Sequence, residues 1–89
     1  MSLSRNPRKI AEDIADGHTS ISQGALRIYT PGDIQSIRDN LDTVQRIVQS
    51  AKLDHGDGQA VQTRNLRLHR IQQTLLVLDE YARKQRQQH

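Results

Sequence analysis

Apolar residues recur at intervals of three and four along two long stretches of the chain. Such spacing places one apolar stripe along a helix and is typical of helices that pair with another helix. The pattern therefore predicts two long helices, over about residues 31–52 and 59–86. The first stripe consists of Ile34, Ile37, Leu41, Val44, Val48 and Ala51, and the second of Val61, Leu68, Ile71, Leu75, Leu78 and Ala82.

A shorter helix is predicted to precede them, after a flexible lead over residues 1–6. Asn6 can cap the free backbone N–H groups of a first turn, and Pro7 suits the first helical position. Gly17 is a natural end for this helix. Its apolar face would consist of Ile10, Ala11, Ile14 and Ala15.

The long helices carry their own start and stop signals. Thr30 followed by Pro31 is a typical helix start, and Asp33 completes a pattern like a capping box. Residues 53–58 contain two glycines and predict a turn. Asp57 in that turn can cap the helix that follows.

Two matching stripes joined by a short turn predict an antiparallel helical hairpin, similar to a coiled coil, over residues 30–89. The fold class is therefore all-α, with residues 7–29 forming the short helix and an irregular connector. In this register Arg64 lies near Val48, close to the turn. The other expected neighbours are Ala51 with Val61, Val44 with Leu68, Leu41 with Ile71, Ile37 with Leu75, and Ile34 with Leu78.

The connector over residues 18–29 is ambiguous. Gly24 weakens a helix there, and the alternation around Leu26 and Ile28 would suit a short strand. A second short helix is also compatible with the sequence. We favour a loop that contains one helical turn.

The chain has more apolar surface than the hairpin would bury. Two helices alone would leave these side chains in water. The short first helix could cover some of them, and a second copy of the chain or a partner helix is expected to cover the rest. We predict a homodimer or higher oligomer that completes a four-helix arrangement, a partner helix, or both. The candidate partner-binding residues are Ile47, Leu66, Leu76, Val77 and Tyr81.

Composition supports the need for a partner. The 89 residues suffice for one domain, but only 34% are hydrophobic, with no Phe, no Trp and two Tyr. A small domain with so few large side chains is commonly stabilised by oligomerisation. The absence of Cys, of an apolar signal segment and of a membrane-spanning run leads us to expect a cytoplasmic protein that does not enter the membrane.

A mild basic excess, with a net charge of +3, raises the question of an acidic partner or phosphate. Arg64, Arg67 and Arg70 lie in a stretch of the last helix without acids, and Arg suits bidentate contacts to phosphate or carboxylate. Salt bridges to the neighbouring helix, for example to Asp42, are the favoured alternative.

Two acidic clusters contain the residue types of metal or acid–base sites. Glu12, Asp16 and His18 are favoured as a solvated helix end. Asp54 and His55, with Asp57, are favoured as a turn, because a calcium loop would need Glu where Asn65 stands. No catalytic residue, metal, cofactor or small-molecule substrate is expected, and neither is an enzyme.

The sequence thus leaves two functions. The favoured one is a non-enzymatic protein–protein interaction module, such as an adaptor, an assembly factor or a small chaperone. The alternative is a small DNA-binding protein in which residues 9–26 form a degenerate helix-turn-helix and the hairpin supplies the dimer. Asp16 and Gly24 depart from that motif, so nucleic acid is the less favoured partner.

Overall fold

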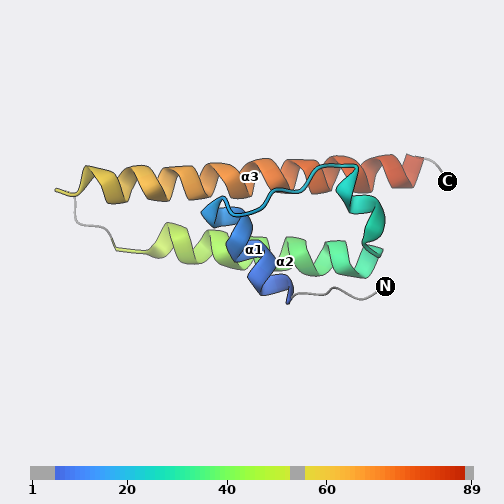
Figure 1. Cartoon of the computed structure of the whole chain (residues 1–89), viewed down its shortest axis with the longest axis horizontal. Helices are drawn as coiled ribbons and strands as arrows, with labels where there is room; N and C mark the ends of the chain where they lie inside the picture. The colour runs from blue at the N-terminus through green and yellow to red at the C-terminus, as the bar shows by residue number, and fades with distance from the viewer. Residues whose placement is uncertain (1–5, 53–55, 88–89) are drawn as a thin grey trace.

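The computed structural model describes residues 6–52 and 56–87, and this part of the chain is helical without any strand. Figure 1 shows the three α-helices: α1 (Pro7–Asp16), α2 (Pro31–Ser50) and α3 (Gly58–Gln87). A single 3₁₀ turn, η1 (Ala25–Ile28), interrupts the connector between α1 and α2. The all-α fold class is confirmed.

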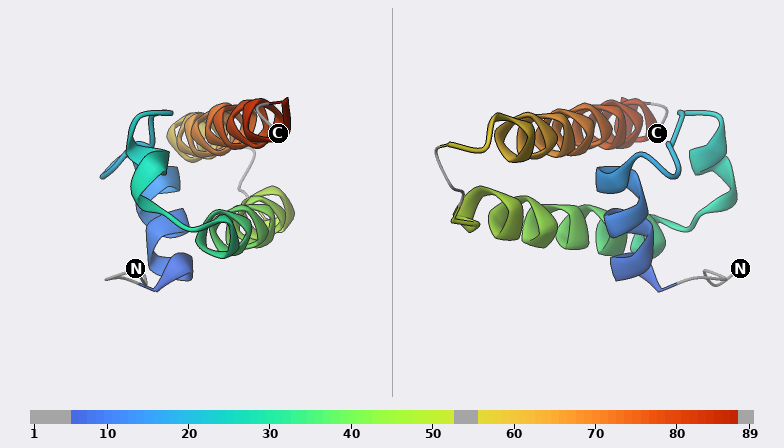
Figure 2. Two further views of the ribbon diagram at one scale, coloured as in Figure 1. Left: turned by 90° about the vertical axis from the view of Figure 1, so that its right-hand side faces the viewer. Right: turned by 60° about the vertical axis from the view of Figure 1, so that its left-hand side comes forward.

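The two long helices lie alongside each other and run in opposite directions, and α1 crosses them on one side (Figure 1). Viewed along the long helices, the three elements occupy the corners of a triangle (Figure 2). Each helix contacts the other two. The core is therefore shared by three helices and is not confined to a seam between two.

Local signals define α1 as the sequence predicts. The Asn6 side chain accepts a hydrogen bond from the Arg8 backbone N–H at 2.8 Å. At the other end, Gly17 has φ +79°, the left-handed conformation that glycine adopts without a steric cost. Its N–H bonds to the Ile14 carbonyl while that of His18 bonds to the Asp13 carbonyl, the paired bonds of a Schellman motif.

The long helices also begin where their capping residues stand. Thr30 and Asp33 exchange side-chain-to-backbone hydrogen bonds of 3.0 and 3.2 Å, which form a capping box. Asp57 caps α3 by accepting from the Ala60 N–H at 3.1 Å. α2 ends at Ser50, slightly before the predicted end at Lys52. Parts of the predicted lead and turn, residues 1–5 and 53–55, lie outside the described residues.

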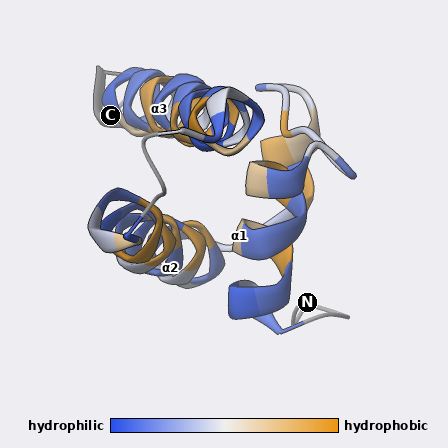
Figure 3. Ribbon diagram, turned by 90° about the vertical axis from the view of Figure 1, so that its left-hand side faces the viewer, coloured by the Kyte–Doolittle hydropathy of each residue, from blue (hydrophilic) through white to orange (hydrophobic). Residues whose placement is uncertain are grey.

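The apolar stripes supply most of the core, and Figure 3 shows apolar positions on all three helices. The ends of the stripes are less covered, because Ala51 and Ala82 are exposed and Val61 is half-buried. The buried apolar residues are Ile10, Ala11, Ile14, Ala15, Leu26, Ile37, Leu41, Val44, Val48, Ile71 and Leu78.

The buried face of α3 differs from the stripe that the pattern predicts. Thr74 is only 8% exposed, whereas the stripe residue Leu75 is half-buried. Thr74 satisfies its hydroxyl by donating to the Arg70 carbonyl at 2.9 Å, so its burial leaves no polar atom unpaired. We attribute the difference to α1, which packs on the Thr74 side of the helix.

The connector is held against α3 by both apolar and polar contacts. Leu26 is fully buried, and Ile21 and Tyr29 pack against the core. Gln23 donates to Glu80 at 3.1 Å and accepts from Lys84 Nζ at 2.9 Å. No part of the segment forms a strand in the described chain, and η1 supplies the helical turn that we expected.

Candidate interaction surface

The acidic cluster at the end of α1 is engaged with neighbouring charges. Glu12 lies 3.9 Å from Arg8 Nε, and the Asp16 carboxylate lies 3.3 Å from Arg67 Nε. His18 Nδ1 lies 3.9 Å from a carboxylate oxygen of Asp13. The acids therefore face basic partners rather than one another. Within the described residues, no three His, Asp or Glu side chains converge as metal ligands would.

The second acidic cluster can be followed only in part. Asp54 and His55 lie outside the described residues. Asp57 accepts the hydrogen bond from Ala60 and stands at the start of α3. Its role as a helix cap, which the sequence suggested, is confirmed.

Two of the three candidate arginines on α3 hold the C-terminal end of α1. Arg67 pairs with Asp16, and Arg70 Nη1 donates to the Ala15 carbonyl at 3.2 Å. The Arg70 guanidinium also lies directly over Gly17, within 2.9 Å of where a β-carbon would stand. Cations suit this position because the last carbonyls of a helix carry partial negative charge. The acid facing Arg67 thus comes from α1, and is not Asp42 of α2.

Arg64, the third arginine, lies in a different setting. It lines a hollow of about 400 Å³ between the last turns of α2 and the first turns of α3, which we call the turn-proximal groove. Its Nε atom is buried and has no hydrogen-bond partner among the described residues. The groove is lined by Val48, Ala51, Asp57, Gln59, Ala60, Thr63, Arg64 and Arg67. Arg64 and Val48 share this hollow, in keeping with the predicted register.

Leu66 does not line this groove; it stands about 200° round α3 from Arg64 and is 51% exposed. Val77 occupies the same face of α3 about three turns later. There it packs against the core and lines a hollow with Ile21 of the connector. The same face of one helix is thus covered at Val77 and open at Leu66.

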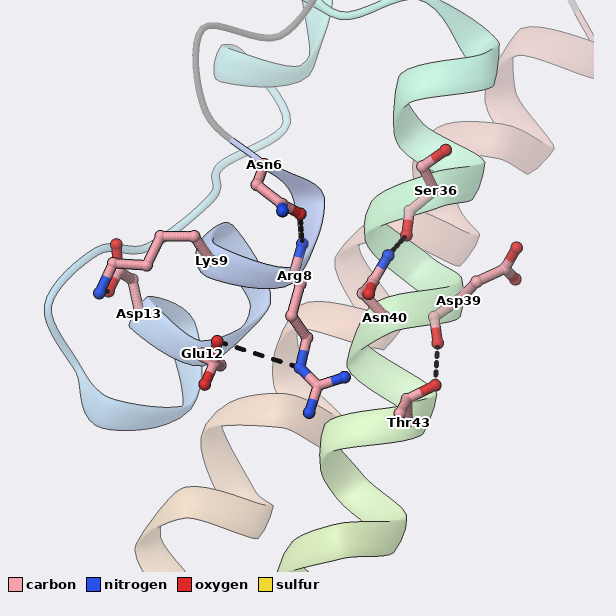
Figure 4. A network of polar contacts seen from close by, with 9 residues as sticks. All are labelled: Asn6, Arg8, Lys9, Glu12, Asp13, Ser36, Asp39, Asn40 and Thr43. Carbon is pink, nitrogen blue, oxygen red and sulfur yellow. Dashed lines mark hydrogen bonds and ion pairs between the residues drawn. The ribbon is translucent and has the colours of Figure 1, made fainter.

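Ile47 of α2 is the counterpart of Leu66 and is also 51% exposed. It follows Asn40 by about two turns on one face of the helix. Figure 4 shows Arg8 of α1 reaching toward this face, beside Asn40 and Thr43. α1 therefore covers the first half of this face of α2 and leaves Ile47 open.

The other predicted partner-binding residues lie elsewhere. Leu76 is 64% exposed and stands about 140° round α3 from the buried Ile71. Tyr81 is half-buried and lines a hollow of about 590 Å³ with Tyr29, at the end of the molecule away from the turn. The five candidates thus do not form one surface.

Ile28 is a large exposed residue that the sequence reading did not select, and it is 69% exposed. In the turn η1 the chain directs Leu26 inward, so Ile28 points outward. The close spacing of the two residues could have indicated this, because side chains two apart do not share a face in a helical turn.

The segment proposed as a helix-turn-helix lacks its second helix. After α1, residues 19–22 have no regular secondary structure, and the next element is the single turn η1. Gly24 precedes that turn and Asp16 is exposed. In the described chain, residues 9–26 thus present no recognition helix for a DNA groove.

Comparison with known proteins adds no relative to this picture. No protein-family model, no curated protein and no solved structure gives a significant match to the chain. Among the described residues, no helix combines the length and the apolar character that crossing a bilayer requires.

Proposed function

We propose that the protein is a non-enzymatic interaction module that binds a helix of a partner protein over Leu66 and Ile47, on the half of the α2–α3 pair near the turn. Roles of this kind include those of an adaptor, an assembly factor or a small chaperone. The proposal involves no chemical step and no cofactor.

One observation carries the proposal. Leu66 and Ile47 stand on the faces of α3 and α2 that α1 and its connector cover further along, and each is 51% exposed. A partner helix on these open faces would extend the same three-helix packing toward the turn. Covering such side chains contributes about 1 kcal/mol each, since full burial of a large aliphatic side chain is worth about 1.5–3 kcal/mol.

The test uses a displayed library of amphipathic helices of about 14 residues, which is about four helical turns. The protein is expected to select binders, and Leu66→Asp and Ile47→Asp are expected to abolish their binding. Gln72→Asp adds the same charge to α3 at an exposed position about 120° round the helix from Leu66 and serves as the control. Circular dichroism checks that all three variants remain helical.

Failure would be plain in this design. The proposal is overturned if no helix is selected, or if the selected helices bind Leu66→Asp and Ile47→Asp as well as the control. Retained binding by Gln72→Asp together with lost binding by Leu66→Asp and Ile47→Asp supports it.

We also propose that two copies associate through the hairpin of residues 30–89 into a four-helix arrangement. The supporting observation is Leu76, which is 64% exposed and lies away from the buried face of α3. Sedimentation equilibrium should give the mass of a dimer, and Leu76→Asp should reduce it to that of a monomer. A monomeric wild-type protein would refute dimerisation but would leave the partner-helix proposal standing.

A further inference from the structure

We infer that the hollow between the connector and α3, which Ile21 and Val77 help to line, is a binding site for a small molecule that carries a phosphate monoester. We call this hollow the connector pocket. Its volume is about 480 Å³, and small-molecule sites typically have volumes of about 300–1,000 Å³. Leu66 and Ile47 do not line it, so the inference stands apart from the partner-helix proposal.

The connector and α3 supply every lining residue except Ile14 of α1. On the connector side, residues 17–21 line the pocket. The first two of these are held in place, because the Gly17 and His18 N–H groups bond back to carbonyls of α1. The lining positions of α3 share one face of the helix, at spacings of one, three or four, and are His69, Arg70, Gln73, Thr74 and Val77.

Arg70 is the charged group that would hold the phosphate. Its Nη1 donates to the Ala15 carbonyl at 3.2 Å and its guanidinium lies over Gly17, so the side chain is already positioned at the pocket. No carboxylate among the described residues pairs with Arg70, whereas Arg67 pairs with Asp16. The other N–H groups of the guanidinium can therefore donate to a ligand, and a planar guanidinium suits the bidentate geometry of phosphate.

The rest of the polar lining also favours an anion. None of the residues that line the pocket is acidic. A phosphate monoester carries about −1.5 to −2 charges near neutral pH and has three strong acceptor oxygens, which need several donors. Neutral side chains that can donate hydrogen bonds are present beside Arg70, namely His18, Thr19, Ser20, His69 and Gln73.

The acids at the end of α1 have basic partners of their own. Asp16 lies 3.3 Å from Arg67 Nε. Asp13 lies 3.3 Å from Lys9 Nζ and 3.9 Å from His18 Nδ1. Because these carboxylates are paired with other cations, they do not neutralise Arg70, which leaves the pocket with a positive charge.

The apolar part of the lining indicates what the phosphate is attached to. Ile21 and Val77 are half-buried and line the pocket together with Arg70. Val77 follows Arg70 by seven residues, which is about 10 Å along the helix. A ligand with its phosphate at Arg70 and a compact apolar group toward Val77 matches both ends of the pocket.

Isothermal titration calorimetry with phenyl phosphate tests the inference, since this probe joins a phosphate monoester to a compact apolar group. Wild-type protein should bind one equivalent saturably. Inorganic phosphate lacks the ring and should bind about 10-fold more weakly, because the apolar contact is lost. Phenol lacks the charge and should not bind. Bound phenyl phosphate should also raise the midpoint of thermal unfolding, since a ligand of the folded chain stabilises it.

Gln73 and Gln72 provide a matched pair of variants. Both are exposed neighbours on α3, but only Gln73 lines the pocket. Gln73→Glu should weaken the binding of phenyl phosphate by about 10-fold or more, because it places a like charge beside the phosphate. Gln72→Glu makes the same change in net charge away from the pocket and should stay within about 2-fold of wild type.

Arg70→Gln should abolish binding, and Arg83→Gln is its control for net charge. Arg83 is an exposed arginine of α3 that does not line the pocket. Arg70 also holds the end of α1, so circular dichroism must show that Arg70→Gln remains helical. If that variant unfolds, the Gln73 and Gln72 pair still decides, because neither side chain is part of the core.

Three results would overturn the inference. The first is that wild-type protein shows no saturable binding of phenyl phosphate. The second is that Gln73→Glu binds the probe as tightly as Gln72→Glu, which would mean that the charge is bound elsewhere on the basic surface. The third is that benzoate binds as tightly as phenyl phosphate, which would remove the assignment to phosphate.

Discussion

The α2–α3 pair has one half near the turn and one half away from it. Both halves carry nearly the same pattern of apolar residues, but only the half away from the turn is covered by other elements. In the half away from the turn, α1 and the connector cover the pair, so Val77 packs against the core. In the half near the turn, the same faces carry Leu66 and Ile47, each 51% exposed. The difference arises because α1 ends at Asp16 and the connector then runs along α3 away from the turn (Figure 1).

The three arginines of α3 also differ between the covered half and the open half. Arg67 and Arg70 lie at the border of the covered half and bind the end of α1. Arg64 lines the turn-proximal groove, and its buried Nε lacks an acceptor in the described chain, as do the Nε atoms of Arg8 and Arg67. The three arginines thus differ in setting: two hold the end of α1, and the third lies toward the turn.

The largest effect is expected from Ile14→Ala, in the covered half. Ile14 is 2% exposed, and removing a large buried side chain typically costs about 2–5 kcal/mol because a cavity remains. We expect a loss near 3 kcal/mol in the free energy of unfolding, measured by urea denaturation. A loss below about 0.5 kcal/mol would mean that α1 does not cover the long helices in solution.

Gly17→Ala should have an intermediate effect. The residue has φ +79°, and a β-carbon there would meet the Arg70 guanidinium at 2.9 Å. We expect a destabilisation of about 1–2 kcal/mol, because a left-handed residue with a β-carbon is strained and Arg70 must leave the end of α1.

Gly32→Ala is the matched control for that experiment. Gly32 lies in the first turn of α2, and a β-carbon there would approach no atom closer than 3.8 Å, the Thr30 hydroxyl. Thermal unfolding should show a neutral or slightly stabilised protein, since Ala favours a helix over Gly by up to about 1 kcal/mol. Equal losses in both variants would show that neither the left-handed conformation nor the contact with Arg70 constrains Gly17.

The smallest effect on stability is expected from Leu66→Ala, in the open half. Leu66 is 51% exposed, and substitutions at such positions usually change the free energy of unfolding by less than about 0.5 kcal/mol. The same urea denaturation as for Ile14→Ala measures it. A loss comparable to that of Ile14→Ala would contradict the comparison, because Leu66 would then be part of the core.

Sequence reasoning succeeded where the deciding interactions are local. The capping bonds of Asn6, Thr30 and Asp57 each join residues two or three positions apart. Gly17 ends α1 through bonds to the preceding turn. Such features depend on neighbours in the chain, so the residues at the helix ends could be identified before the structure was known.

Sequence reasoning was less complete wherever contact with a neighbouring helix decides which residue is buried or which charges pair. Leu75 is the residue that an apolar stripe selects, yet Thr74 is the more buried. Asp42 was a plausible partner for the arginines, yet Asp16 of α1 faces Arg67. Both outcomes depend on where α1 lies, which the periodicity of the long helices does not encode.

The sequence by itself therefore determined that the chain is helical, where its helices begin, and which residues have an apolar face to bury. Those properties follow from backbone capping and from side-chain spacing within one helix. Only the tertiary structure decided which part of that apolar face is covered. One short helix cannot span the whole length of α2 and α3, and its position leaves Leu66, Ile47 and Arg64 at the open end.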